Sequence, residues 1–184
     1  DYYMPEYVEL NINKATSGNH DIILGRKYLK YRNSNPIVEF PYTYNRLAYQ
    51  AINAMFLRRD LYNNISFSEL RLFEDRGTLP RLVYHTKNLG LIPISPYVWV
   101  FNKQSAVFGS NISKSLFYIN LSMIENIEYF KKVNPEYKLP YSIDKVLYNH
   151  NTRIIKYKDE LKEKYPEDWN KYITYINSLN SNSE

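Results

Sequence analysis

Glycine is scarce and widely spaced in this chain, and this limits the sites that its 184 residues can form. The five glycines stand alone, with none within three residues of another: Gly18, Gly25, Gly77, Gly90 and Gly109. Loops that cradle phosphate groups need closely spaced glycines, because several backbone N–H groups must face the anion. The chain contains neither of the common glycine-rich nucleotide motifs, so we expect no nucleotide-binding enzyme of either type.

Cysteine is absent, which excludes disulfide bonds, cysteine-ligated zinc, iron–sulfur clusters and thiol catalysis. The three histidines, His20, His85 and His150, have no second histidine three or four residues away, so no helical metal-binding pair is predicted. We therefore expect no metal and no cofactor. The lack of cysteine and of a secretion signal favours an intracellular or mitochondrial location over secretion.

The length and the 44% hydrophobic content predict a folded chain with a core of its own. The apolar patterns predict a mixed α+β fold, with short antiparallel strands in an N-terminal arm and in the centre, a central helix pair and a helical C-terminal third. We expect an extended strand-rich arm over residues 1–41, a mixed α+β body over 42–180 and a flexible tail over 181–184.

The expected strands share alternating apolar residues and cover 6–14, 21–31, 36–41, 81–85, 97–101 and 115–121. The first two are expected to form a hairpin, and the third, bracketed by prolines, suits a sheet edge. Pro93 and Pro96 argue against regular pairing before the fifth. The expected helices share capping residues and apolar positions at helical spacing, and cover 43–62, 66–77, 122–133, 142–161 and 166–180.

The net charge of +5 is unevenly distributed along the chain. Residues 22–158 hold 20 bases and 9 acids, a net charge of +11, whereas both ends are acidic. A basic middle attracts polyanions such as RNA. Lysines and arginines that only solvate helix faces would give the same pattern.

The densest basic segment contains Arg26, Lys27, Tyr28, Lys30 and Arg32. In a strand, all of these except Lys27 would share one face, because side chains alternate. Three cations around a tyrosine ring suit phosphates and stacked bases. The alternative is an edge strand that lysine and arginine protect from aggregation.

A second group of candidate RNA-binding residues consists of arginines, namely Arg58, Arg59 and Arg81. Arginine favours bidentate contacts with phosphates or carboxylates. Nearby acids, Asp60 among them, offer the alternative of internal ion pairs.

Tyrosine is abundant, with 20 residues, more than one core of this size can hold with every hydroxyl paired. The surplus is expected at surfaces, where tyrosine is typical of protein interfaces. Our leading hypothesis is a non-catalytic structural subunit of a large intracellular assembly, a ribonucleoprotein similar to an organellar ribosome. The basic middle would contact ribosomal-type RNA and the aromatic, acidic ends would contact several protein subunits, with no membrane and no small-molecule substrate.

Two alternatives stay open. The first is a structural component of a viral or phage particle with protein contacts only. The second is a small enzyme that uses His85, because the order of His85-Thr86 and Tyr118 resembles the His, Tyr and Glu order of some ADP-ribosyltransferases. The position after Tyr148-Asn149, where that family has its acid, holds His150.

Overall fold

The chain divides into two compact units. A computed structural model describes residues 2–31, 37–40, 52, 55–63, 65–101, 112–138 and 151–181. The first unit, called the sheet unit below, comprises Asp1–Ser66 and Thr78–Ser105; the second, the helical unit, comprises Phe67–Gly77 and Ala106–Glu184. The expected mixed α+β class is confirmed. The expected boundary between residues 41 and 42 lies outside the described residues.

The described part of the sheet unit contains a five-stranded sheet. Its strands are β1 (Tyr2–Tyr3), β2 (Ile22–Tyr31), β3 (Ile37–Phe40), β4 (Met55–Leu57) and β5 (Leu89–Phe101). The order is β1-β5-β2-β3, and β4 also pairs with β2. The central pair, β2 and β5, is parallel, whereas the other pairs are antiparallel. The expected antiparallel pairing is therefore present in three pairs, whereas β2 and β5 are parallel, because a long connection that contains a helix joins them.

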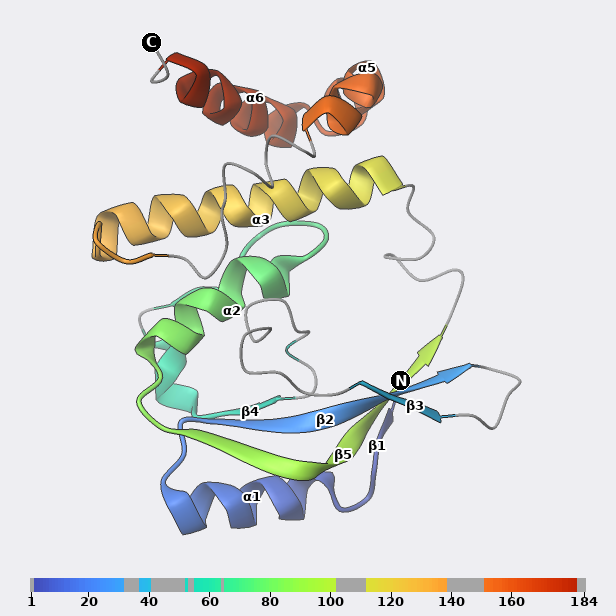
Figure 1. Cartoon of the computed structure of the whole chain (residues 1–184), viewed down its shortest axis with the longest axis vertical. Helices are drawn as coiled ribbons and strands as arrows, with labels where there is room; N and C mark the ends of the chain where they lie inside the picture. The colour runs from blue at the N-terminus through green and yellow to red at the C-terminus, as the bar shows by residue number, and fades with distance from the viewer. Residues whose placement is uncertain are drawn as a thin grey trace. The chain divides into compact units, whose positions relative to one another are not determined.

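Helices cover both faces of the sheet (Figure 1). Helix α1 (Tyr7–Gly18) packs on β2 and β5. On the other face, Ile22 and Leu24 of β2 pack in one apolar cluster with Leu79 and Leu82 of helix α2 (Glu74–His85). Ile23, the residue between Ile22 and Leu24, is also buried, as expected for a strand with both faces covered.

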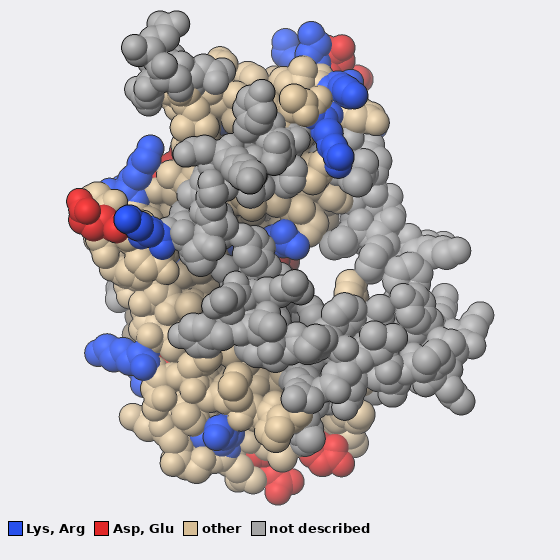
Figure 2. Space-filling model, in the orientation of Figure 1, with Lys and Arg blue, Asp and Glu red and all other residues tan. Residues whose placement is uncertain are grey.

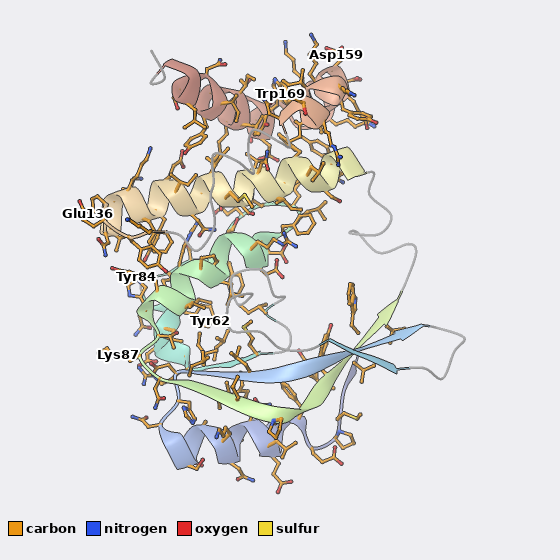
Figure 3. The ribbon with its side chains drawn as sticks, in the orientation of Figure 1. Tyr62, Tyr84, Lys87, Glu136, Asp159 and Trp169 are labelled. Atoms are coloured by element: carbon orange, nitrogen blue, oxygen red, sulfur yellow. The ribbon has the colours of Figure 1, made fainter. Side chains whose placement is uncertain are left out.

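The helical unit is formed by α3 (Ile112–Val133), the 3₁₀ helix η4 (Ile155–Tyr157), α5 (Lys158–Lys164) and α6 (Pro166–Ser181). Its core is rich in aromatic rings. Phe117 of α3 lies edge-on to Tyr172 of α6 at 5.5 Å and 6.2 Å from Trp169, measured between ring centres. Trp169 is buried on α6 (Figure 3). No helix of the described residues is both long enough and apolar enough to cross a bilayer.

The N-terminal segment is a helix and not the strand expected over residues 6–14. The alternating residues Val8 and Ile12 are exposed, whereas Asn11, out of step with that alternation, is buried. The helix ends because Asn19 adopts a left-handed conformation, with φ of 48°. The expected hairpin between this segment and the next is consequently wrong.

The expected central helix pair differs most from the structure. Within 43–62, residues 55–57 form β4 and Arg59–Tyr62 forms the 3₁₀ helix η3, while residues 43–51 lie outside the described part. The helix expected over 66–77 cannot pass through Phe73, whose φ is 59°. Helix α2 starts at Glu74 instead and includes the strand expected over 81–85.

Helix α3 replaces the strand expected over 115–121 and the separate helix expected from Ser122. Ser122 lies in mid-helix, where its hydroxyl donates to the Ile119 carbonyl at 2.7 Å instead of capping a helix start. Phe117, Tyr118, Leu121 and Ile124 are buried at helical spacing. A helix with a wide apolar face also shows alternating apolar residues over a short stretch, and this is why a strand was predicted here.

Several expected elements are confirmed. β2 covers the segment expected over 21–31, and β3 lies at a sheet edge as its prolines indicated. β5 covers 97–101 but starts eight residues earlier, at Leu89, and its two prolines lie within a shift of the register. Helix α3 ends before Asn134-Pro135, and α6 starts at Pro166. Of the helix expected over 142–161, the described residues from 151 are helical, with η4 interrupting them.

Burial raises the pKa of several tyrosine hydroxyls. The pKa of Tyr7 is raised to about 12 by burial and by the nearby Tyr3, and its hydroxyl donates to the Met55 carbonyl at 3.0 Å. Burial raises the pKa of Tyr172 to about 12 as well. Burial and the hydrogen bond to Asp168 raise the pKa of Tyr118 still further. These hydroxyls stay protonated in the folded chain.

We expect the free energy of unfolding to fall as the pH rises from 10 to 12. An unfolded tyrosine loses its proton near pH 10, whereas Tyr7 and Tyr172 hold theirs to about 12 when folded. Between these two pKa values the folded chain binds more protons than the unfolded chain. The contribution of the two tyrosines to the free energy of unfolding is therefore fully present below pH 10 and is lost as the pH rises above 10. Urea unfolding at pH 9 and 11 measures the fall, which Tyr172→Phe should reduce. An equal fall in wild type and variant would contradict this prediction.

Candidate nucleic-acid interface

The basic segment expected to bind RNA lies in the central strand β2. Arg26, Lys27, Tyr28 and Lys30 are part of this strand, whereas Arg32 lies outside the described residues. β5 pairs with one side of the segment and β3 with the other, so the alternative of an edge strand is wrong. The side chains in this stretch of β2 are not described, and their common cationic face stays a prediction.

The three candidate arginines also belong to the sheet unit, but they differ in their surroundings. Arg58 forms ion pairs with Asp21 and Asp60, both at 2.6 Å. The hydrogen bond to Asp60, ahead of the charge of Asp21, raises the pKa of Arg58. Arg59 is exposed at the start of η3, and Arg81 is half-buried in α2. The internal ion pairs that were the alternative for this group are thus present for Arg58.

Asp21 is a buried carboxylate at the start of β2, and sequence reasoning missed its role. Only 3% of it is exposed. Its Oδ2 accepts hydrogen bonds from the backbone N–H groups of Lys87 at 2.6 Å and Asn88 at 3.1 Å, while Oδ1 faces the Arg58 guanidinium. One carboxylate therefore joins the α1–β2 turn, the α2–β5 turn and the residue before η3.

His20 and Asn88 complete this network (Lys87, beside them, is labelled in Figure 3). His20 Nδ1 lies 3.1 Å from Asn88 Oδ1, and Asn88 Nδ2 donates to the Gly18 carbonyl at 2.7 Å. A Cβ atom on Gly18 or Gly90 would lie within 3 Å of the His20 ring. A side chain at either position would therefore displace the His20 ring. The network lies at the amino ends of the parallel strands, whereas ligands in such sheets bind beyond the carboxyl ends.

The residues of the enzyme alternative lie in different units. His85 is exposed at the end of α2, edge-on to Tyr84 with 5.0 Å between ring centres, and not in the expected strand. Tyr118 is fully buried in the helical unit and donates to Asp168 at 2.8 Å. Its hydroxyl therefore has a structural partner within its own core. His150 lies outside the described residues.

A cavity of about 490 Å³ opens on the helical unit. Lysine, arginine and carboxylate side chains line it together: Glu69, Arg71, Glu125, Lys164, Glu167, Asp168 and Lys171. Arg71 and Lys114 lie 5.7 and 5.2 Å from the centre of the Tyr165 ring, a cation–π geometry. Lys171 pairs with Glu125 at 3.1 Å. Charged side chains of both signs therefore line the same cavity.

The described residues contain no group of three or more histidine or carboxylate side chains that could hold a metal ion. The chain matches no model of a known protein family and no characterised protein sequence. The function must therefore be inferred from the residues themselves.

Asp21→Ala is expected to destabilise the sheet unit. The change leaves the N–H groups of Lys87 and Asn88 without their acceptor, which costs about 2–3 kcal/mol of the free energy of unfolding. Urea unfolding measures the loss. Asp60→Ala is the matched control, since it removes the other, exposed carboxylate beside Arg58 and should change stability little. Equal effects of the two substitutions would refute the role given to Asp21.

Proposed function

We propose that the chain is a non-catalytic structural subunit of an intracellular ribonucleoprotein similar to an organellar ribosome. Its basic strand β2 contacts RNA, and its acidic, aromatic N-terminal region contacts a protein neighbour. Arg59 contributes a further phosphate contact, whereas Arg58 is committed to Asp21 and Asp60. The proposal includes no substrate and no cofactor.

The outer face of α1 is the observation that carries this proposal. Val8 is 56% exposed and Ile12 46% exposed, one helical turn apart, and Tyr3 is 49% exposed nearby in sequence. Glu6 and Glu9 are exposed in the same region of the chain, and Figure 2 shows acidic side chains, with a basic one near them, at this end of the sheet unit. Adjacent exposed apolar side chains with a polar rim are typical of protein interaction surfaces. Acidic side chains beside the apolar ones favour a basic neighbour.

The RNA contact rests on the position of the basic residues along β2. Arg26, Tyr28 and Lys30 occupy alternate positions of one continuous strand, which is the arrangement that puts cations and a stacking ring on a single face. Arg32 is the next residue of this alternation in the sequence. Cations at this spacing can follow a phosphate backbone.

RNA binding by the full chain should weaken steeply with salt. Arg26→Ala/Lys30→Ala removes two phosphate contacts and should lower the slope of log Kd against log salt by about 1.4, at about 0.7 per contact. Fluorescence anisotropy with a labelled single-stranded RNA measures the slope. Lys132→Ala/Lys138→Ala, exposed in the helical unit, is the matched control and should leave the slope unchanged.

If the wild-type chain shows no salt-dependent binding, the RNA contact is refuted. Self-association that added RNA does not affect would instead favour the particle component with protein contacts only. Light scattering with and without RNA separates these outcomes.

Val8→Asp/Ile12→Asp should release the chain from its assembly. The two side chains are exposed, so the melting temperature should change little, while charge on the apolar face opposes docking. Sedimentation of the tagged chain with large particles, from cells that express it, measures the release. Asn13→Asp, exposed on another side of the same helix, should still sediment with them. If Val8→Asp/Ile12→Asp does so too, α1 is not the docking face.

A further inference from the structure

A short exposed segment of the helical unit is basic and aromatic and holds no acid. It covers residues 151–158 and includes Arg153, Lys156, Tyr157 and Lys158. All four side chains are exposed, and Tyr157 is 41% exposed in spite of its size. Figure 2 shows lysine and arginine side chains, with acidic side chains beside them, over the end of the helical unit that holds α5. We call these four residues the basic ridge.

The core of the helical unit forces the basic ridge outward. Ile154 and Leu161, seven residues apart and therefore on one side of a helix, are 0% and 3% exposed. Both belong to the apolar cluster with Trp169 and Tyr172. Figure 3 shows Asp159 on the outer side of α5. Because the Ile154 side chain is buried in this cluster, the residues on either side of it along the chain are exposed to solvent.

Helical spacing brings the ridge residues together. Lys156 and Tyr157 lie three and four residues after Arg153, so they are its neighbours on the helix surface. Residues 155–157 form the 3₁₀ turn η4, and all three side chains are exposed. The exposed Tyr157 ring thus shares its side of the helix with Arg153, and Lys156 and Lys158 flank it in the sequence.

Two lysines of this unit are neutralised by carboxylates, in contrast to the cations of the ridge. Lys164 is held by Glu160 at 3.0 Å and Lys171 by Glu125 at 3.1 Å. Within the described part of the chain, no ion pair with a carboxylate neutralises the charges of Arg153, Lys156 and Lys158.

We propose that the basic ridge is a second RNA contact, which binds single-stranded RNA. Arg153, Lys156 and Lys158 contact phosphates, and the Tyr157 ring stacks on a base. Stacking distinguishes this partner from an acidic protein, because every base offers a π-face to an exposed ring. The inference rests on the proposed function and adds to it a contact in the helical unit, outside the strand β2.

The test uses the full chain and a labelled 20-nucleotide oligouridine. Arg153→Ala/Lys156→Ala/Lys158→Ala should lower the slope of log Kd against log salt by about 2, at about 0.7 per phosphate contact. Tyr157→Ala should weaken binding about tenfold, as expected for the loss of one stacked base. Tyr157→Phe keeps the ring and should bind as wild type does. Lys132→Ala/Lys138→Ala again serves as the control, and circular dichroism confirms that each variant is folded.

The outcomes separate this inference from the proposed function. If wild type binds RNA and only the β2 variant loses affinity, the ridge is refuted and the proposed function stands. If wild type binds no RNA, the RNA part of the proposed function fails, and the ridge with it. If polyglutamate competes as well as RNA does and Tyr157→Ala has no effect, the ridge is a site for acidic protein. Loss in the ridge variants with recovery in Tyr157→Phe supports the proposal.

Discussion

The sheet unit depends on one buried carboxylate, that of Asp21. Its oxygens accept hydrogen bonds from the backbone at Lys87 and Asn88 and pair with Arg58, and its own backbone carbonyl accepts the Arg58 N–H at 2.8 Å. A buried charge is tolerated only where hydrogen bonds and opposite charge compensate it. Asp21 therefore fixes the start of both central strands, although no local sequence pattern identifies it. Arg58, which the sequence suggested as an RNA contact, pairs with Asp21 instead.

The basic residues consequently fall into two kinds. Arg58, Lys164 and Lys171 are satisfied within the molecule by carboxylates. Arg153 and Lys156 have no such ion pair among the described residues. An excess of positive charge in a sequence counts both kinds together, although only the second kind attracts a polyanion. The RNA contact that we propose therefore depends on where the cations lie and not on how many there are.

The sequence predicted correctly those elements whose position is determined by nearby residues such as prolines and helix-capping acids. The prolines around β3, and Pro166 followed by two acids at α6, fix an edge and a helix start within a few residues. Helices α1 and α3 were predicted to be strands, because a few apolar residues alternate in each by chance. Which of their residues are buried depends on segments distant in the sequence. Helix α2 was misplaced because the left-handed conformation of Phe73 depends on tertiary packing. The same holds for the site: the role of Arg58 depends on Asp21, far from it in the sequence.

We expect the parallel pairing of β2 with β5 to delay the folding of the sheet unit during synthesis. Ile22 pairs with Leu89, 67 residues later (89 − 22), so the ribosome must release most of this unit before its central ladder can close. Contacts of such long sequence separation form slowly and leave strands unpaired in the meantime. Arg26, Lys27 and Lys30 lie close together in the nascent β2. Repulsion between these cations on two nascent chains would discourage wrong strand-to-strand association until the correct partner strand arrives.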